Sequence, residues 1–81
     1  MIKVLIADDE RLARETIKML LNERDEIIEV WEASTGEETI SLATAMQPDI
    51  VFLDIEMPQK NGLEVAQSLP SHCLIVFVTA F

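Results

Sequence analysis

The chain has 81 residues, 49% of them hydrophobic, which is enough apolar material for one small folded domain and too much for a disordered chain. Fifteen acidic residues outnumber six basic ones, so the formal net charge is −9. This balance leaves no basic patch for phosphate backbones, so it excludes direct nucleic-acid binding by this segment and favours cations and basic protein surfaces as partners.

The first half of the chain alternates patterns typical of strands and helices. Residues Ile2–Ala7 form a nearly continuous apolar run, as expected of a strand covered on both faces. Residues Arg11–Asn22 carry apolar side chains at helical spacing, and residues 27–33 predict a second strand, more mixed in composition and therefore at a sheet edge. The charged residues of the helix fall largely outside its apolar stripe; they are Arg11, Arg14, Glu15 and Lys18.

A second helix is expected after the second strand. Ser34 and Glu37 resemble a capping box, in which each side chain accepts from the backbone N–H of the other residue. The helix runs to about Met46, and the Gln-Pro-Asp sequence that follows breaks it. Residues 50–53 are all apolar and predict the third strand.

The remaining residues predict a third helix and a fourth strand. Asn61 can cap a short helix over residues 62–69, which Pro70 stops. Leu74–Val78 is apolar at every position and predicts a strand. The resulting order β-α-β-α-β-α-β is typical of α/β proteins with a parallel, doubly wound sheet and right-handed crossovers.

Cysteine content and hydropathy indicate where the protein works. Cys73 is the only cysteine, which excludes an internal disulfide and a cysteine metal site; we expect it to be a small buried hydrophobe. No apolar run approaches the ~20 residues of a membrane-spanning helix, and the apolar start reaches Asp8 too early for a signal peptide. We therefore expect a cytoplasmic domain without a membrane partner.

Three acidic residues follow predicted buried strands. Asp8 and Asp9 come directly after the first strand, and Asp54 comes directly after the third. If these strands are neighbours in a parallel sheet, the three carboxylates meet at one edge and repel one another. A hard divalent cation with oxygen ligands relieves that repulsion, so the sequence predicts a site for Mg²⁺, or for Mn²⁺ in its place, that can also hold phosphate.

Three blocks of the sequence resemble those of bacterial response-regulator receiver domains, and together they span the chain. They are residues 6–10 (Ile-Ala-Asp-Asp-Glu), residues 53–58 with 61–64 (Leu-Asp-Ile-Glu-Met-Pro and Asn-Gly-Leu-Glu), and residues 78–80 (Val-Thr-Ala). Residues 9–14 and 76–81 are most similar to receivers joined to LytTR-type DNA-binding domains.

The resemblance implies a flavodoxin-like receiver fold, in which five parallel strands have the order 2-1-3-4-5 and the site lies between strands 1 and 3. The sequence ends after the fourth predicted strand. We therefore expect residues 1–81 to be the N-terminal fragment of a receiver domain, with the order 2-1-3-4. The fifth strand, the lysine that follows it and the last two helices of the family are missing.

The resemblance also implies a role for each site residue. Asp54 corresponds to the phosphoacceptor, and Thr79 to the hydroxyl that donates to a phosphoryl oxygen and reports phosphorylation. Asp8, Asp9 and Asp54, with the backbone carbonyl of Glu56, correspond to the Mg²⁺ ligands. The implied function is acceptance of a phosphoryl group from a sensor histidine kinase, which switches a C-terminal output domain expected to bind DNA. Such a module assists its own phosphorylation and is not a turnover enzyme.

Each residue also has a simpler interpretation. Asp9 can be a helix N-cap, Asp54 a turn residue and Thr79 a strand-end hydroxyl. Two other function classes stay open. One is a phosphatase of the haloacid-dehalogenase type, which needs a second Asp two residues after the nucleophile, where this chain has Glu56. The other is a phosphate-independent docking or dimerisation module on a receiver scaffold.

The fourth strand also predicts self-association. Leu74–Val78 suits an interior strand, yet no further strand is predicted to pair with its outer edge. An unpaired apolar strand edge is a template for another chain. We expect a homodimer, or an oligomer in which the fourth strand is exchanged between chains.

Overall fold

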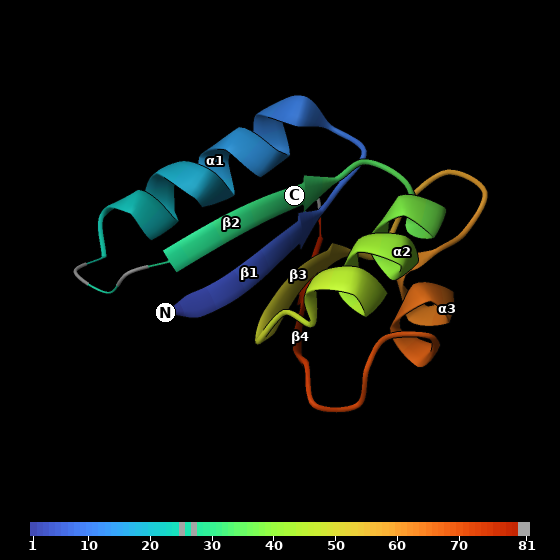
Figure 1. The fold of residues 1–81 in the computed structure, drawn as a ribbon. Helices are drawn as coiled ribbons and strands as arrows, with labels where there is room; N and C mark the ends of the chain where they lie inside the picture. Colours follow the sequence, from blue (N-terminus) through green and yellow to red (C-terminus); the bar gives the residue numbers. More distant parts are fainter. Residues whose placement is uncertain (25, 27, 80–81) are drawn as a thin grey trace.

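The computed structural model describes residues 1–24, 26 and 28–79. Along these residues strands and helices alternate, as the sequence predicts (Figure 1). In chain order they are β1 (Ile2–Ala7), α1 (Arg11–Asn22), β2 (Ile28–Ala33), α2 (Gly36–Met46), β3 (Ile50–Asp54), α3 (Gly62–Gln67) and β4 (Leu74–Val78).

The strands form one parallel sheet in the order β2-β1-β3-β4. β1 pairs with β2 on one side and with β3 on the other, and β3 pairs with β4. The doubly wound α/β fold, this strand order and the edge position of β2 are therefore confirmed. Strand order reverses between β1 and β3, so the loops that leave these two strands diverge and open a space between them, the usual place for a ligand in such sheets.

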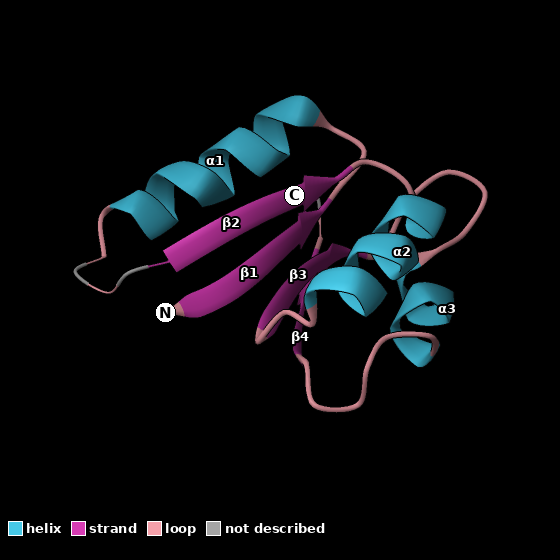
Figure 2. Ribbon diagram, viewed as in Figure 1, coloured by secondary structure: helices cyan, strands magenta, loops and turns pink. Residues whose placement is uncertain are grey.

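The helices cover the two faces of the sheet unequally (Figure 2). α2 and α3 lie together on one face, where Leu5, Leu53, Ala43 and Val65 form part of the buried core. Residues of β1 alternate between the faces, so Val4 points to the side of α1. α1 lies on this side beside β2, and none of its residues is fully buried.

The face that α1 occupies carries an apolar groove of about 470 Å³. Its walls come from α1 and from all four strands, among them Leu21, Phe52 and Val76. β4 is exposed beyond it: Leu74 is 61% and Phe77 is 42% accessible. In the part of the chain that the structure describes, β4 is thus an edge strand with apolar side chains in contact with solvent, as its sequence predicts.

The start of α2 differs from the prediction of a capping box at Ser34 and Glu37, which is wrong by one residue. The N-cap is Thr35, whose extended backbone precedes the helix and whose hydroxyl accepts from the N–H of Glu38 at 3.1 Å. The carboxylate of Glu38 in turn accepts from the backbone N–H of Ser34 at 2.7 Å. The helix therefore begins at Gly36, one residue later than the predicted cap implies, and Gly36 lies close to the Lys60 side chain.

Two other predicted boundaries need small corrections. α3 has the predicted capping box between Asn61 and Glu64 but ends at Gln67, because Ser68 already closes a tighter turn by donating to the Val65 carbonyl at 2.9 Å. β3 extends one residue beyond the predicted 50–53. The first residue of the predicted 27–33 strand lies outside the described residues.

The last residue of β3 is Asp54, which pairs with Val78 of β4. This pairing fixes the backbone of Asp54 within the sheet rather than in a free turn. Among the described residues, no helix combines the length and the apolar character that crossing a membrane requires.

Candidate functional site

The three predicted acidic residues converge at the carboxyl ends of β1 and β3. One carboxylate oxygen from each of Asp8, Asp9 and Asp54 lies within 4.8 Å of the other two. Asp8 and Asp54 are buried, with 6% and 8% of their surfaces accessible, whereas Asp9 is exposed. The predicted meeting of these side chains at one edge of the sheet is confirmed.

Asp8 is held at three points. Its backbone N–H donates to the Ala33 carbonyl at the end of β2 at 3.1 Å, and its backbone carbonyl accepts from the Arg14 guanidinium at 2.9 Å. Its carboxylate accepts from the backbone N–H of Glu10 at 2.9 Å. Glu10, and not Asp9, is the N-cap of α1, so the simpler interpretation of Asp9 as a cap is wrong.

Asp54 is held by the loop that follows it. Its carboxylate accepts from the backbone N–H of Glu56 at 3.1 Å. The next residue, Ile55, donates its backbone N–H to the Val78 carbonyl at 3.3 Å and accepts from the Gly62 N–H at 2.8 Å. The loop therefore folds back on itself, and its backbone closes around Asp54.

Gly62 is required by this closure. A Cβ atom at residue 62 would lie 2.5 Å from the Asp54 carbonyl oxygen and 2.9 Å from the Ile55 Cα, both of them backbone atoms that cannot move aside cheaply. The sequence pattern predicts a turn and a helix start at residue 62 but does not reveal this contact. The Asn-Gly pair at 61–62 is the signal that could find it, since glycine marks a close approach of backbones.

The close approach of the three carboxylates affects the protonation of Asp54. The pKa of Asp54 is raised, first because burial disfavours its charged form and then because the negative charges of Asp8 and Asp9 oppose it. The Glu56 N–H acts in the opposite direction. A cation at this position would relieve the repulsion, and the cluster offers only the hard oxygen donors that Mg²⁺ and Mn²⁺ favour. The residues present therefore fit a divalent metal ion.

Thr79 lies at the same site. A cavity of about 110 Å³ is lined by Asp8, Asp54 and Thr79, together with Glu10, Ala13 and Val78. Thr79 is exposed to solvent. The metal role of the Glu56 carbonyl stays a prediction, while its N–H contacts Asp54 as described.

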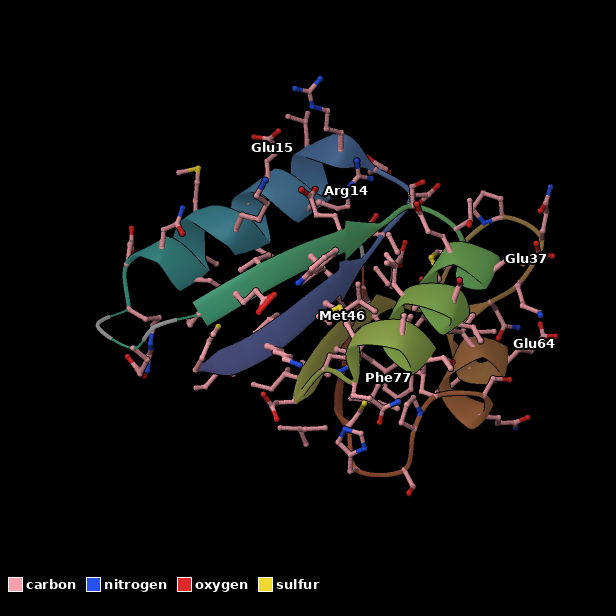
Figure 3. All side chains as sticks on the ribbon, in the orientation of Figure 1. Arg14, Glu15, Glu37, Met46, Glu64 and Phe77 are labelled. Carbon is pink, nitrogen blue, oxygen red and sulfur yellow. The ribbon has the colours of Figure 1, made fainter. Side chains whose placement is uncertain are left out.

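Arg14 is a second residue near the acidic site, after Gly62, whose contact there the sequence pattern does not reveal. Its position outside the apolar stripe of α1 predicts a solvent-facing charge, yet only 17% of its side chain is accessible. Figure 3 shows Arg14 beside the end of β2, whereas Glu15 points away from the sheet. Hydropathy spacing cannot find such a residue, because the pattern counts every arginine as polar, whether its side chain is exposed or largely covered.

Comparison with known proteins gives a consistent result. The family described as response regulator receiver domain matches residues 4–81. The chain is 49% identical over 83 residues to the transcriptional regulatory protein BtsR of Escherichia coli and 39% identical over 85 residues to the sensory transduction protein LytT of Oceanobacillus iheyensis. It aligns over 100% and 99% of its own length, but spans only 35% of each relative.

Solved structures show the same fold. The response regulator domain of Thermotoga maritima CheB superposes with a TM-score of 0.89 at 28% identity, covering 98% of this chain and 60% of that domain. The N-terminal domain of a Wolinella succinogenes protein superposes with a TM-score of 0.82 at 31% identity, covering 100% of this chain and 66% of the other. Since the family match covers nearly the whole sequence and the fold agrees, the chain belongs to the response regulator receiver domains.

Proposed function

We propose that this chain is the phosphoacceptor part of a two-component response regulator and that Asp54 receives the phosphoryl group. The observation that carries the proposal is that the buried Asp54 carboxylate, which clusters with those of Asp8 and Asp9, lines a small cavity together with Asp8 and Thr79. The alternative of a haloacid-dehalogenase phosphatase has no support, because the chain belongs to a different family.

The chemistry follows from these positions. An Asp54 carboxylate oxygen forms a bond to phosphorus as the P–N bond of a phosphohistidine breaks, and the electron pair leaves with the imidazole. The Glu56 N–H orients the carboxylate through its other oxygen. Thr79 donates its hydroxyl to a phosphoryl oxygen. Asp8, Asp9, Asp54 and the Glu56 carbonyl would hold Mg²⁺, or Mn²⁺, which when bound neutralises charge on the phosphoryl group.

The proposal extends to the protein in which this segment acts. BtsR is named a transcriptional regulator, and the chain spans 35% of its length. We therefore place residues 1–81 at the N-terminal part of a receiver domain, followed by an output domain that binds DNA. The phosphodonor is a sensor histidine kinase, the compartment is the cytoplasm, and the domain acts as a switch rather than as a turnover enzyme.

Intact-mass spectrometry tests the assignment. Treatment with acetyl phosphate and Mg²⁺ should add the mass of one phosphoryl group, labile in base because an acyl phosphate forms. Asp54→Asn should abolish the gain, and Thr35→Ala, which removes a hydroxyl that follows β2 at the same end of the sheet, should retain it. Thr79→Ala should leave phosphorylation possible and weaken the amide-shift response to it. A gain that persists in Asp54→Asn would assign the phosphate elsewhere.

A second candidate function is association with another copy of this chain. The specific observation is the exposed outer edge of β4, with Leu74 at 61% and Phe77 at 42% accessibility, beside an apolar groove of about 470 Å³. Strand pairing between two β4 edges would satisfy both backbones and bury these side chains. Sedimentation equilibrium over a range of concentrations tests it: a mass that rises toward the dimer supports it, and a constant monomer mass contradicts it.

A further inference from the structure

We propose that Arg14 is a positioning residue for the metal site: it holds the loop that carries Asp8 and Asp9 in the geometry that binds a divalent cation. The inference rests on the proposed function, since it concerns the affinity of those same carboxylates. Arg14 acts on them through the backbone. Its contact is with the backbone carbonyl of Asp8, at 2.9 Å.

The backbone of Asp8 needs such a partner. Asp8 is buried, so a carbonyl without a hydrogen bond there would lose its solvation without compensation. The Ala33 carbonyl fixes the N–H of Asp8 at 3.1 Å, and Arg14 fixes its carbonyl. Together they determine how the chain leaves β1 and where the next residue, the exposed Asp9, presents its carboxylate.

Arg14 is itself fixed in place. Its Nε donates to one carboxylate oxygen of Glu32 on β2 at 3.0 Å, while Nη1 of the same guanidinium donates to Asp8. The other oxygen of Glu32 accepts from Lys18 at 3.0 Å. Lys18 and Arg14 lower the pKa of Glu32, so its carboxylate stays charged at neutral pH. The planar fork of arginine can serve two acceptors at once, which a lysine ammonium on its flexible stem does less well.

Without the hydrogen bond from Arg14, repulsion between carboxylates would favour opening of the loop that carries Asp8 and Asp9. Three carboxylate oxygens within 4.8 Å of one another repel in the absence of a cation. The hydrogen bond from Arg14 opposes that repulsion without occupying a ligand position. Residues that orient metal ligands in this indirect way typically change affinity about 10- to 100-fold when they are removed.

The direction in which metal affinity changes when Arg14 is replaced distinguishes a positioning role from a purely electrostatic one. Arg14 is a cation, so its charge alone disfavours a second cation nearby, and removing that charge would tighten metal binding. Loss of a positioning contact would weaken it. Arg11 supplies the matched control, because it carries the same charge on the same helix, its side chain is 82% exposed and its guanidinium pairs with Glu15 rather than with the loop.

The experiment is a titration of the chain with Mg²⁺, followed by backbone amide shifts, for the wild type, Arg14→Gln, Arg14→Lys and Arg11→Gln. We expect Arg14→Gln to raise the Kd on the order of 10-fold, Arg14→Lys to raise it less, and Arg11→Gln to leave it unchanged or lower it slightly. In the metal-free protein, Arg14→Gln should also speed amide exchange of Glu10, whose N–H donates to Asp8. Urea unfolding identifies any variant that fails to fold.

If Arg14→Gln does not fold, Glu32→Gln tests the inference instead. This variant retains Arg14 but weakens the hydrogen bond that holds its guanidinium in place. We expect it to raise the Kd for Mg²⁺ by less than Arg14→Gln would. An unchanged or lower Kd in the folded Arg14 variants would overturn the positioning role while leaving the metal site intact. Absence of any Mg²⁺ response in the wild type would instead overturn the metal site, and the inference with it.

Discussion

Single residues decide the geometry around Asp54. Burial, and then the neighbouring carboxylates, raise the pKa of Asp54, and its carboxylate is held by a backbone group: it accepts from the N–H of Glu56 at 3.1 Å. The loop that supplies this donor can close only because residue 62 has no side chain. Chemistry at Asp54 and the identity of Gly62 are therefore linked through one loop.

Gly62→Ala should destabilise the fold and disturb the site together. The new methyl group would lie 2.5 Å from the Asp54 carbonyl oxygen, and overpacking against backbone costs about 1–3 kcal/mol of unfolding free energy. Gly36→Ala is the matched control, because its methyl group would lie 3.0 Å from Lys60 Cβ and Val65 Cγ2, a tight contact but a milder one than the 2.5 Å approach at residue 62. Urea unfolding should show the larger loss for Gly62→Ala; equal losses would contradict the argument.

The free thiol gives a second test at this scale. Burial, with a further contribution from the charge of Asp49, raises the pKa of the Cys73 thiol. The thiolate is the reactive form, so alkylation by iodoacetamide at mildly alkaline pH should be much slower in the folded protein than in urea. Because Sγ also donates to the Pro48 carbonyl, at 3.0 Å, the thiol has a buried structural role. Equal rates in both states would show that this part of the fold opens readily.

At the scale of elements, α1 is the least buried helix and is tied to the sheet by charge as well as by apolar contact. None of its residues is fully buried, but Arg14 and Lys18 both donate to Glu32 of β2 at 3.0 Å. α2 and α3, in contrast, share the buried core on the other face. The attachment of α1 should therefore depend on pH in a way that the attachment of α2 does not.

The expected pH dependence has a definite sign. Hydrogen bonds from Lys18 and Arg14 lower the pKa of Glu32 below its usual 4.5. The interaction of the Glu32 carboxylate with these two cations therefore stabilises the fold fully above pH 4.5. The stabilisation is lost as pH falls through the lowered folded pKa. Its size is about 1 kcal/mol or less, because the pair is partly exposed. Unfolding free energy measured between neutral and acidic pH should fall less steeply in Glu32→Gln than in the wild type.

Glu15→Gln is the control for that series, since Glu15 pairs with the exposed Arg11 on the outer side of the same helix. It should follow the wild-type pH profile. If Glu32→Gln also followed the wild-type profile, the network between α1 and β2 would not contribute measurably to stability.

For the whole molecule, charge and apolar surface oppose each other. The chain carries a net charge of −9, which repels a second copy, while the edge of β4 and the apolar groove favour contact with one. Salt screens the repulsion, with a Debye length of about 8 Å at physiological ionic strength, and leaves the apolar term in place. Any association between copies should therefore strengthen as salt is added.

Sedimentation at low and high salt checks this prediction. The dimer fraction should rise with salt in the wild type, and Val76→Lys, which places a charge at the groove and on the free strand, should lower it at every salt concentration. Leu63→Lys is the control, because Leu63 is 56% exposed on α3, which lies on the other face of the sheet from the groove. A dimer fraction that falls with salt would mean that ion pairs, rather than apolar burial, hold the copies together.

The sequence by itself determined the α/β class and placed three carboxylates directly after strands 1 and 3. That these two strands are neighbours followed from the resemblance of three sequence blocks to receiver domains, and carboxylates at the ends of neighbouring parallel strands share one edge. The structure confirms that the side chains of Asp8, Asp9 and Asp54 meet there.

The tertiary structure alone decided which side chains support those carboxylates. The burial of Arg14 depends on the distance from α1 to the end of β2, and the need for Gly62 depends on a loop that returns to within contact of Asp54. The choice of Thr35 rather than Ser34 as the N-cap of α2 was likewise visible only in the structure, where Gly36 lies close to Lys60. Contacts between residues far apart in the chain fix the first two, and no periodicity along the sequence records such contacts.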